Sequence, residues 1–270
     1  MIVLSLFDGI SCGQIALRRA WIPITEYYAS EVDKNAIKVT QHNFPDTIQV
    51  WDVTKINKQN LPLEKVDLLM WGSPCQAFSN AWKMRGFEDE RSQLFFEFVR
   101  LLKLYKPKHF LFENVRMKQE WLDIITEHLW VEPIRINSKL VSGGLRDRYY
   151  WTNIPNITQP EDRNINFQSI LDSGYADRLK ARAILASEAY PTKNMESAYK
   201  RYKKYGFWNL VFASKDLLPK SARYLNQKEL ERLMTMPEWY TSILNRNQAC
   251  KLIGNGWTVE VVKHLLAWMK

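Results

Sequence analysis

The sequence predicts an α/β protein with a Rossmann-like, doubly wound and mostly parallel sheet, and three observations lead to that prediction. Short apolar, β-rich runs alternate with amphipathic helical patterns through the first half of the chain. Their spacing suits strand–helix–strand units, which build parallel sheets. The alternation is lost after about residue 156, and a helical pattern returns from Leu225. The 270 residues suffice for one large domain, or for one domain with a small addition.

Five strands are predicted in the first half of the chain. The runs are IVLSLF at 2–7, ITEYYAS at 24–30, TIQVWD at 47–52, VDLLMW at 66–71 and HFLFENV at 109–115. Helices are predicted at 11–21, 34–44, 92–105 and 118–129. Near the C-terminus, NQKELERLMTM predicts a helix with Asn226 as its N-cap, and TVEVVKHLLAWMK predicts a terminal helix. Residues 156–222 are predicted to form a small insertion of irregular or mixed structure.

Composition excludes several classes of protein. The three cysteines, Cys12, Cys75 and Cys250, form no CxxC pair, and the four histidines are scattered, so neither a disulfide framework nor a metal site is predicted. The segment MIVLSLFDGI lacks the features of a signal peptide, and no apolar run approaches the roughly 20 residues that span a bilayer. We therefore expect a soluble, cytoplasmic protein with no membrane partner.

The charge distribution favours a polyanionic partner. The net charge is +9, and residues 176–223 contain eleven Lys or Arg against four acids, a net charge of +7. Within this stretch AYKRYKKYGFWN interleaves cations with aromatic residues, a pattern that suits phosphate contact combined with base or sugar packing. A solvated helix face is the alternative. The residues predicted to contact nucleic acid here are Lys200, Arg201, Lys203 and Lys204.

The strand ends carry the residues that a cofactor would need, because ligands of such sheets bind beyond the carboxyl ends of the strands. In FDGISCGQ, Gly9 and Gly13 allow close backbone approach, but the spacing is not GxGxxG. In SEVD, Glu31 can accept hydrogen bonds from two ribose hydroxyls. In WD, Asp52 can accept a hydrogen bond from an adenine amino group, or it can simply cap a turn. Together they predict a nucleoside cofactor without a pyrophosphate, for which S-adenosylmethionine fits better than NAD.

Seven motifs follow one another in the order found in one enzyme family. They are FDGISCG, SEVD, the Asp of WDV, GSPCQ, FENV, RDR within GGLRDRYYW, and GNGWTVEVV. The chain thereby resembles the DNA cytosine-5 methyltransferases over nearly its whole length except the insertion. PCQ is the usual bacterial form, whereas YYASEVDKNAI, LFFEFVRLL and GNGWTVEVV are similar to the animal de novo branch. The resemblance implies a class I S-adenosylmethionine-dependent methyltransferase fold.

The implied reaction transfers a methyl group from S-adenosyl-L-methionine to C5 of a flipped cytosine, with S-adenosyl-L-homocysteine as product. Cytosine C5 is a poor nucleophile until C6 has been attacked, and Cys75 is the predicted attacking thiol. Glu113 is predicted to share a proton with N3 and to accept from the N4 amino group. Arg146 and Arg148 alternate on a predicted strand, would share a face, and are implied to support the base.

Further site residues follow from the resemblance. The implied cofactor-binding residues are Phe7, Asp8, Gly9, Ile10, Ser11, Glu31, Val32, Asp52, Val53, Pro74, Asn255, Gly256 and Trp257. The segment 76–91 matches the mobile loop that closes over the flipped base, and its predicted DNA contacts are Gln76, Ser79, Lys83 and Arg85. Residues 1–155 and 223–270 are expected to form the catalytic domain, and residues 156–222 a small target-recognition region for a short target sequence.

The expected partner is double-stranded DNA. The chain is expected to be a stand-alone modification enzyme of a bacterium or phage, either with a cognate restriction endonuclease or as an orphan. Three alternatives stay open: a tRNA cytosine-5 methyltransferase, a catalytically silent relative that binds DNA, and a generic basic nucleic-acid-binding protein. The last explains the charged insertion but not the ordered motifs.

Overall fold

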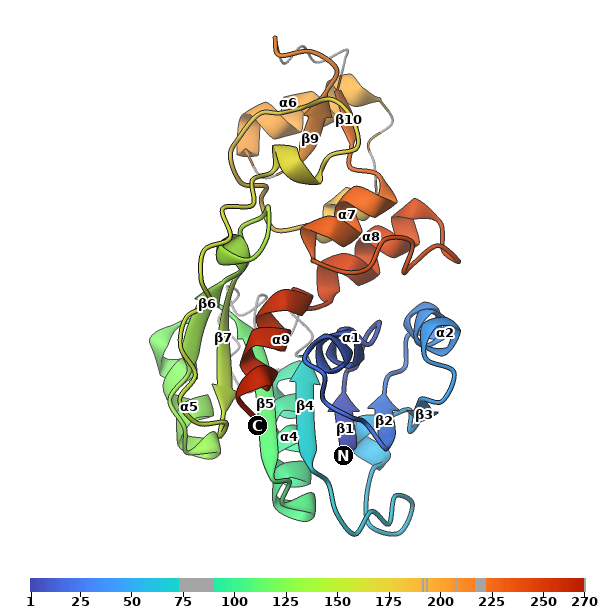
Figure 1. Ribbon diagram of the computed structural model, residues 1–270, viewed down its shortest axis with the longest axis vertical. Coiled ribbons are helices and arrows are strands. Elements are labelled where there is room, and N and C mark those ends of the chain that lie inside the picture. The colour runs from blue at the N-terminus through green and yellow to red at the C-terminus, as the bar shows by residue number, and fades with distance from the viewer. Residues whose placement is uncertain (73–89, 191, 193, 207, 217–221, 270) are drawn as a thin grey trace. The chain divides into compact units, whose positions relative to one another are not determined.

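The computed structural model describes residues 1–72, 90–190, 192, 194–206, 208–216 and 222–269 (Figure 1). They form two compact units. The sheet unit contains Met1–Ile136, Asp147–Gln159 and Val262–Lys270, and the second unit contains Asn137–Arg146 and Pro160–Val261. The bounds of these units differ from those of the predicted domains: residues 137–146 and 223–261 group with the second unit, and residues 156–159 with the sheet unit. The catalytic and target-recognition roles of the predicted domains stay predictions.

The sheet unit is built on one seven-stranded mixed sheet in the order β3-β2-β1-β4-β5-β7-β6 (Figure 1). All pairings from β3 to β5 are parallel, and β5 pairs with β7 in the antiparallel sense. The five predicted strands are therefore confirmed. The strands are β1 (Ile2–Leu6), β2 (Glu26–Ser30), β3 (Ile48–Gln49), β4 (Leu68–Gly72), β5 (His109–Val115), β6 (Ile134–Asn137) and β7 (Asp147–Thr152).

Both faces of this sheet are covered, because alternate side chains of a strand point to opposite faces. On one face Leu69, Trp71 and Phe112 pack in a buried cluster with Phe95 and Phe98 of helix α4 (Glu90–Tyr105). On the other face helix α1 (Cys12–Arg19) approaches so closely that a Cβ on Gly13 would lie 2.5 Å from Met70 Cε. The sheet is thus doubly wound, as predicted.

The remaining helices begin and end close to the predicted bounds. Helix α2 begins after Asp33, whose carboxylate accepts from the N–H groups of Asn35 and Ala36. The predicted helices of this group are α2 (Lys34–Asn43), α5 (Gln119–Leu129) and α9 (Val259–Leu266), with the 3-10 turn η8 (Ala267–Met269) inside the predicted terminal helix. The 3-10 helix η1 (Val53–Lys55) was not predicted.

The second unit has more regular structure than the sequence predicts. Its three-stranded antiparallel sheet has the order β10-β9-β8, and helix α6 packs against it. Helix α7 has Asn226 as its N-cap in a capping box with Glu229, as predicted. Helix α8 was not predicted. The elements are η4 (Ser138–Leu140), η5 (Gln168–Ile170), β8 (Tyr175–Ala176), η6 (Ala186–Ala189), α6 (Met195–Tyr205), β9 (Leu210–Phe212), β10 (Ala222–Tyr224), α7 (Gln227–Leu233) and α8 (Arg246–Asn255).

Candidate cofactor and catalytic site

The loop after β1 has an unusual backbone. Phe7, Gly9 and Ser11 have φ angles of 53°, 59° and 55°, in the left-handed region that residues other than Gly, Asn and Asp rarely adopt. Such conformations persist where surrounding contacts fix them, and they concentrate at ligand sites. Ile10 is buried, and Phe7 packs edge-on against Trp71 with ring centroids 4.5 Å apart. The Phe7 side chain therefore anchors the loop to the sheet.

Glu31 lies just beyond the end of β2, beside this loop. Its Oε2 accepts from the Gly9 N–H at 2.9 Å, and its Oε1 accepts from the N–H groups of Val32 and Asp33 at 2.7 and 2.8 Å. These three main-chain donors hold the carboxylate in one orientation. The adjacent Val32 is 65% exposed, so an apolar side chain stands next to this acceptor. An acceptor beside an apolar surface is what a nucleoside requires.

Asp8 is held from inside the loop. The Tyr27 hydroxyl donates to Asp8 Oδ1 at 2.6 Å, and the Ser11 hydroxyl donates to Oδ2. Desolvation raises the pKa of Asp8 to about 6, although hydrogen bonds from Ser11, Ser5 and Tyr27 act in the opposite direction. Tyr27 is a site residue that the sequence analysis missed, because in sequence it is only one of the aromatic residues in a buried strand.

Asp52 precedes the 3-10 helix η1 at the end of the third strand region. Its Oδ1 accepts from the N–H and the hydroxyl of Thr54 at 2.9 and 2.8 Å, and these bonds lower the pKa of Asp52. The alternative that Asp52 caps a turn is thus confirmed, and its contact with adenine stays a prediction. The Val53 side chain is buried in the sheet core, so any contact that Val53 makes with a cofactor would come from its main chain.

Glu113 and Arg148, two of the predicted catalytic residues, form an ion pair that is nearly buried. Arg148 Nε lies 2.8 Å from Glu113 Oε1, and the two side chains are 11% and 4% exposed. Glu113 is paired in the sheet with Gly72, the last residue of β4. The GSPCQ segment begins at Gly72, so the predicted nucleophile follows three residues after the position beside Glu113. Gly72, Glu113 and Arg148, which are far apart in sequence, therefore lie at one end of the sheet.

Six predicted site residues lie outside the described residues. They are Pro74, Cys75, Gln76, Ser79, Lys83 and Arg85. Their assigned roles stay predictions.

Arg146 does not share a strand face with Arg148, and that prediction is corrected. Strand β7 begins at Asp147, and Arg146 belongs to the second unit. Its buried guanidinium donates to the carbonyls of Gly254 and Gly256 at 3.1 and 2.8 Å, at the C-terminal end of helix α8. A cation suits a helix C-terminus, where the last carbonyls need donors. Arg146 thus holds the GNGW segment in place.

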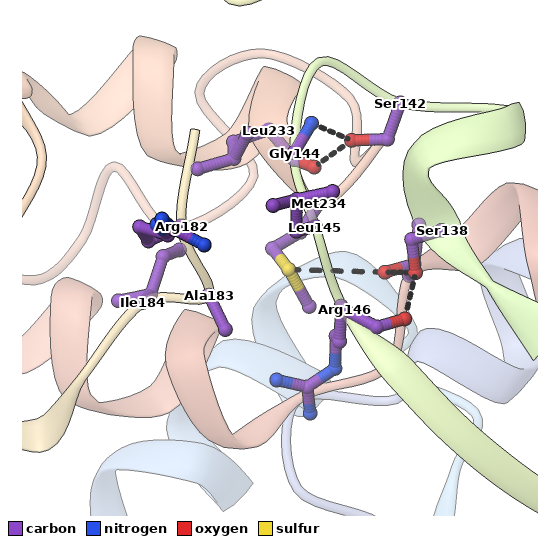
Figure 2. Close-up of a pocket in the computed structure, with 11 residues that line it drawn as sticks. Ser138, Ser142, Gly144, Leu145, Arg146, Arg182, Ala183, Ile184, Leu233 and Met234 are labelled. Atoms are coloured by element: carbon purple, nitrogen blue, oxygen red, sulfur yellow. Dashed lines mark hydrogen bonds between the residues drawn. The ribbon is translucent and has the colours of Figure 1, made fainter. Parts of the chain in front are cut away.

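A small cavity lies next to Arg146 in the second unit (Figure 2). The cavity volume is about 10 Å³, close to what one water molecule needs. Ser138 and Ser142 face this region: the Ser138 hydroxyl donates to Thr258 Oγ1 at 2.8 Å, and the Ser142 hydroxyl donates to the Leu233 carbonyl at 2.6 Å. A cavity of this size cannot hold a nucleoside, so it is a packing feature.

Asn255 is the last residue of helix α8 in the second unit, and Gly256 and Trp257 come directly after it. Gly256 is the C-cap of the helix, and its N–H donates to the carbonyls of Leu252 and Ile253. The Trp257 side chain is 7% exposed. Their predicted contact with a cofactor stays a prediction.

Two aromatic rings of the basic segment contribute to the fold. Tyr199 and Tyr202 pack against Phe212 in a small hydrophobic core, and the Tyr202 hydroxyl donates to Asp177 at 2.6 Å. Both rings are only partly buried, so their packing against bases or sugars stays a prediction. The cations of the segment (Lys200, Arg201, Lys203 and Lys204) are exposed. Phosphate contact by these side chains stays a prediction.

Two absences concern only the described parts of the chain. Those residues contain no group of three or more His, Cys, Asp or Glu side chains that could hold a metal ion. Within the same ranges no helix is both long and apolar enough to cross a membrane.

Comparisons with known proteins agree with the motifs. A family model described as C-5 cytosine-specific DNA methylase matches residues 1–129 and 143–270. The chain is 33% identical over 275 residues to the orphan methyltransferase M.SPRI of Bacillus phage SPR, with 94% of this chain and 58% of that protein covered. It is 28% identical over 305 residues to the type II methyltransferase M.NlaX of Neisseria lactamica, with 99% and 96% covered. The chain thus spans less than two thirds of the length of the phage relative M.SPRI.

Solved structures share the fold. The methyltransferase EhMeth of Entamoeba histolytica superposes with a TM-score of 0.75 at 19% identity, covering 100% of this chain and 97% of that one. A putative DNA modification methyltransferase encoded within an E. coli prophage gives a TM-score of 0.68 at 19% identity, with 100% and 98% covered. At these identities the likeness establishes the fold alone, which is the predicted α/β methyltransferase fold.

Proposed function

Because the chain belongs to the C-5 cytosine-specific DNA methylase family, we propose that it transfers a methyl group from S-adenosyl-L-methionine to C5 of cytosine in double-stranded DNA. Members of this family use S-adenosyl-L-methionine. The observation that carries the proposal is the placement of Glu113, which is paired with Arg148 and lies beside the strand end that leads to Cys75.

Cys75 begins the reaction. Its thiolate forms a bond to cytosine C6, and the electron pair of the C5–C6 double bond becomes available at C5. When bound, S-adenosyl-L-methionine supplies an electrophilic methyl group at its sulfonium. After transfer, loss of the C5 proton restores the double bond and expels the thiolate, so S-adenosyl-L-homocysteine and 5-methylcytosine are the products. The base must leave the stack first, at a cost of a few kcal/mol.

Glu113 assists this attack. Electron density moves toward N3 and O2 as the bond to C6 forms, so a carboxyl that shares a proton with N3 lowers the barrier. The same carboxyl accepts a hydrogen bond from the N4 amino group. The Arg148 guanidinium at Oε1 fixes the orientation of the carboxyl group. Positioned acids and bases of this kind contribute about 10²- to 10⁴-fold to rate.

The loop after β1 and the end of β2 fit the cofactor. Glu31 offers an oriented carboxylate for the ribose hydroxyls, and exposed Val32 offers an apolar surface next to it. The Gly9 N–H donates to this carboxylate and so keeps the loop beside it. The chemistry of these groups supports a nucleoside cofactor. The site offers a hydrogen-bond acceptor and an apolar side chain, rather than the row of free N–H groups that a pyrophosphate needs.

DNA contact is assigned to exposed cations. Lys200, Arg201, Lys203 and Lys204 on α6 supply positive charge for phosphates. The region 156–222 is proposed to recognise a short target. The M.SPRI relative is an orphan methyltransferase and M.NlaX a type II methyltransferase, so this chain acts either without a cognate restriction endonuclease or with one.

The test is transfer of labelled methyl groups to unmethylated duplex DNA and, in parallel, to tRNA, followed by base-resolution mapping. Label at C5 of cytosine in DNA supports the proposal and gives the target sequence. Label only in tRNA keeps the chemistry and replaces the substrate. Label in neither, with the cofactor bound, identifies a catalytically silent relative.

A further inference from the structure

A buried polar network lies beneath the loop that follows β1. At its centre the Tyr27 hydroxyl of β2 donates to Asp8 Oδ1 at 2.6 Å, and the Tyr27 side chain is 3% exposed. The Ser11 hydroxyl donates to the other oxygen of the same carboxylate. Asp8 is therefore held from two sides by groups on two different elements.

The network extends into helices α1 and α2. Ser11 Oγ accepts from Gln14 Nε2 and from the Thr40 hydroxyl, each at 3.2 Å, and Gln14 Nε2 also donates to Thr47 Oγ1 at 2.7 Å. A hydroxyl has one donor and two acceptor positions, so the Ser11 hydroxyl uses its full capacity. Networks in which each polar group is satisfied rigidify their surroundings.

This network determines where the loop directs its main chain. Phe7 and Gly9 flank Asp8 and have positive φ angles. This backbone turns the Gly9 N–H toward Glu31 Oε2, at 2.9 Å. A shift of Asp8 would move this N–H, since the two groups are in adjacent residues. Glu31 would then lose one of the three donors that fix its carboxylate.

We propose that Tyr27 is a positioning residue of the cofactor site: its hydroxyl holds Asp8 and, through Asp8, the loop whose Gly9 N–H orients Glu31. The inference rests on the proposed function, because it assumes that Glu31 binds the cofactor. Tyr27 itself is buried and acts through Asp8.

The close packing around Tyr27 supports this role. A Cβ on Gly13 would lie 3.1 Å from the Tyr27 hydroxyl oxygen, so the glycine in FDGISCG leaves room for that hydroxyl. The neighbouring Tyr28 provides a matched control on the same strand. Its hydroxyl donates to Glu26 Oε2 at 2.9 Å in an exposed position, away from the loop.

The network also makes cofactor binding sensitive to pH. Asp8 has a pKa raised to about 6 by desolvation, and the nearby Glu31 carboxylate acts in the same direction, whereas Tyr27, Ser11 and Ser5 act against it. Helices α1 and α2 present the uncharged Ser11, Gln14 and Thr40 to the network. Removing the Tyr27 hydroxyl removes one stabilising donor, so the pKa of Asp8 rises further in Tyr27→Phe.

The experiment compares Tyr27→Phe with Tyr28→Phe in the full chain. Calorimetry measures binding of S-adenosyl-L-homocysteine from pH 5.5 to 8.5, and methyl transfer gives kcat and the KM for S-adenosyl-L-methionine. We expect Tyr27→Phe to weaken binding about tenfold at pH 7, as for loss of a hydrogen bond to a charged group. The acidic limb of its binding profile should move to higher pH, while kcat at saturating cofactor changes less than about twofold and Tyr28→Phe behaves as the wild type.

Thr40→Val provides a second test should Tyr27→Phe fold poorly. It removes the donor to Ser11 and should weaken binding in the same direction by a smaller factor. If the folded variants bind the cofactor as tightly as the wild type and with the same pH profile, the inference is overturned and the proposed function stands. A wild-type protein that does not bind S-adenosyl-L-homocysteine would overturn both the inference and the proposed function.

Discussion

Glu113 and Arg148 are diagonal neighbours on two antiparallel strands, and their charged groups meet at 2.8 Å. In the register of β5 and β7, Glu113 is opposite Tyr150, two residues from Arg148, so both side chains point to the same face of the sheet. The pair is nearly buried, and a buried charge without its partner is costly. Each residue therefore fixes the other, which matters for a carboxyl that must meet one edge of a base.

Glu113→Gln should lower kcat by about 10²-fold or more, because the amide cannot share a proton with cytosine N3 in the same way. Binding of S-adenosyl-L-homocysteine should stay within about twofold of wild type, because Glu31 and the loop after β1 are unchanged. Single-turnover methyl transfer and calorimetry measure the two quantities. Near-normal turnover would remove Glu113 from the mechanism.

Cys75→Ser should abolish methyl transfer and leave DNA and cofactor binding largely intact, since a hydroxyl is a far weaker nucleophile at C6. The matched control is Cys250→Ala. Burial raises the pKa of the Cys250 thiol to about 11, so this thiol stays protonated and unreactive. We expect Cys250→Ala to retain methyl transfer at temperatures where it is folded. Wild-type turnover in Cys75→Ser would contradict the assignment.

Arg146→Lys should act through stability. An ammonium group cannot reproduce the planar pair of donors that reaches both Gly254 and Gly256. We expect a loss of about 1–3 kcal/mol in the free energy of unfolding, measured by urea titration. Arg148→Lys, in contrast, should lower kcat. A kcat loss in a fully stable Arg146→Lys protein would instead support the catalytic role that the resemblance implied.

Glu188 should make stability depend on pH. Its side chain is 1% exposed, and desolvation raises the pKa from 4.5 to about 7. The folded state therefore holds the proton more tightly than the unfolded state, so this contribution is fully present below about pH 4.5. It is lost as the pH rises to about 7, by about 3 kcal/mol. Urea titrations at several pH values should show a shallower decline in Glu188→Gln, and parallel curves for the two proteins would contradict the prediction.

The double variant Lys200→Ala, Lys204→Ala should weaken DNA binding and reduce its dependence on salt. Each lost phosphate contact lowers the slope of log K against log salt by about 1. The control replaces Lys65 and Lys106, two exposed lysines of the sheet unit, and makes the same change in net charge. Binding titrations between about 50 and 200 mM salt measure the slopes of both variants. Equal slopes for the two variants would show that α6 does not contact DNA.

The sequence by itself determined the strand order along the chain and the chemistry at the strand ends. Apolar runs such as VDLLMW and HFLFENV predict strands because both faces of a central strand are buried. Glu31 and Asp52 could be singled out as candidates because ligands of parallel sheets bind beyond the carboxyl ends of the strands, and Glu113 was singled out by the resemblance. Their contacts with a ligand stay predictions. The helix after Asn226 was predictable because its capping box is local.

Tertiary structure decided the directions of side chains and the partners of distant residues. Tyr199 and Tyr202 turned inward because the short strands β8, β9 and β10, too short to give a clear pattern, form a sheet that they cover. Arg146 left the strand face because the carbonyls at the end of α8 accept its donors. Glu113 met Arg148, and Tyr27 met Asp8, only through the pairing of the strands. Such contacts depend on register and burial between segments far apart in sequence, which no local pattern encodes.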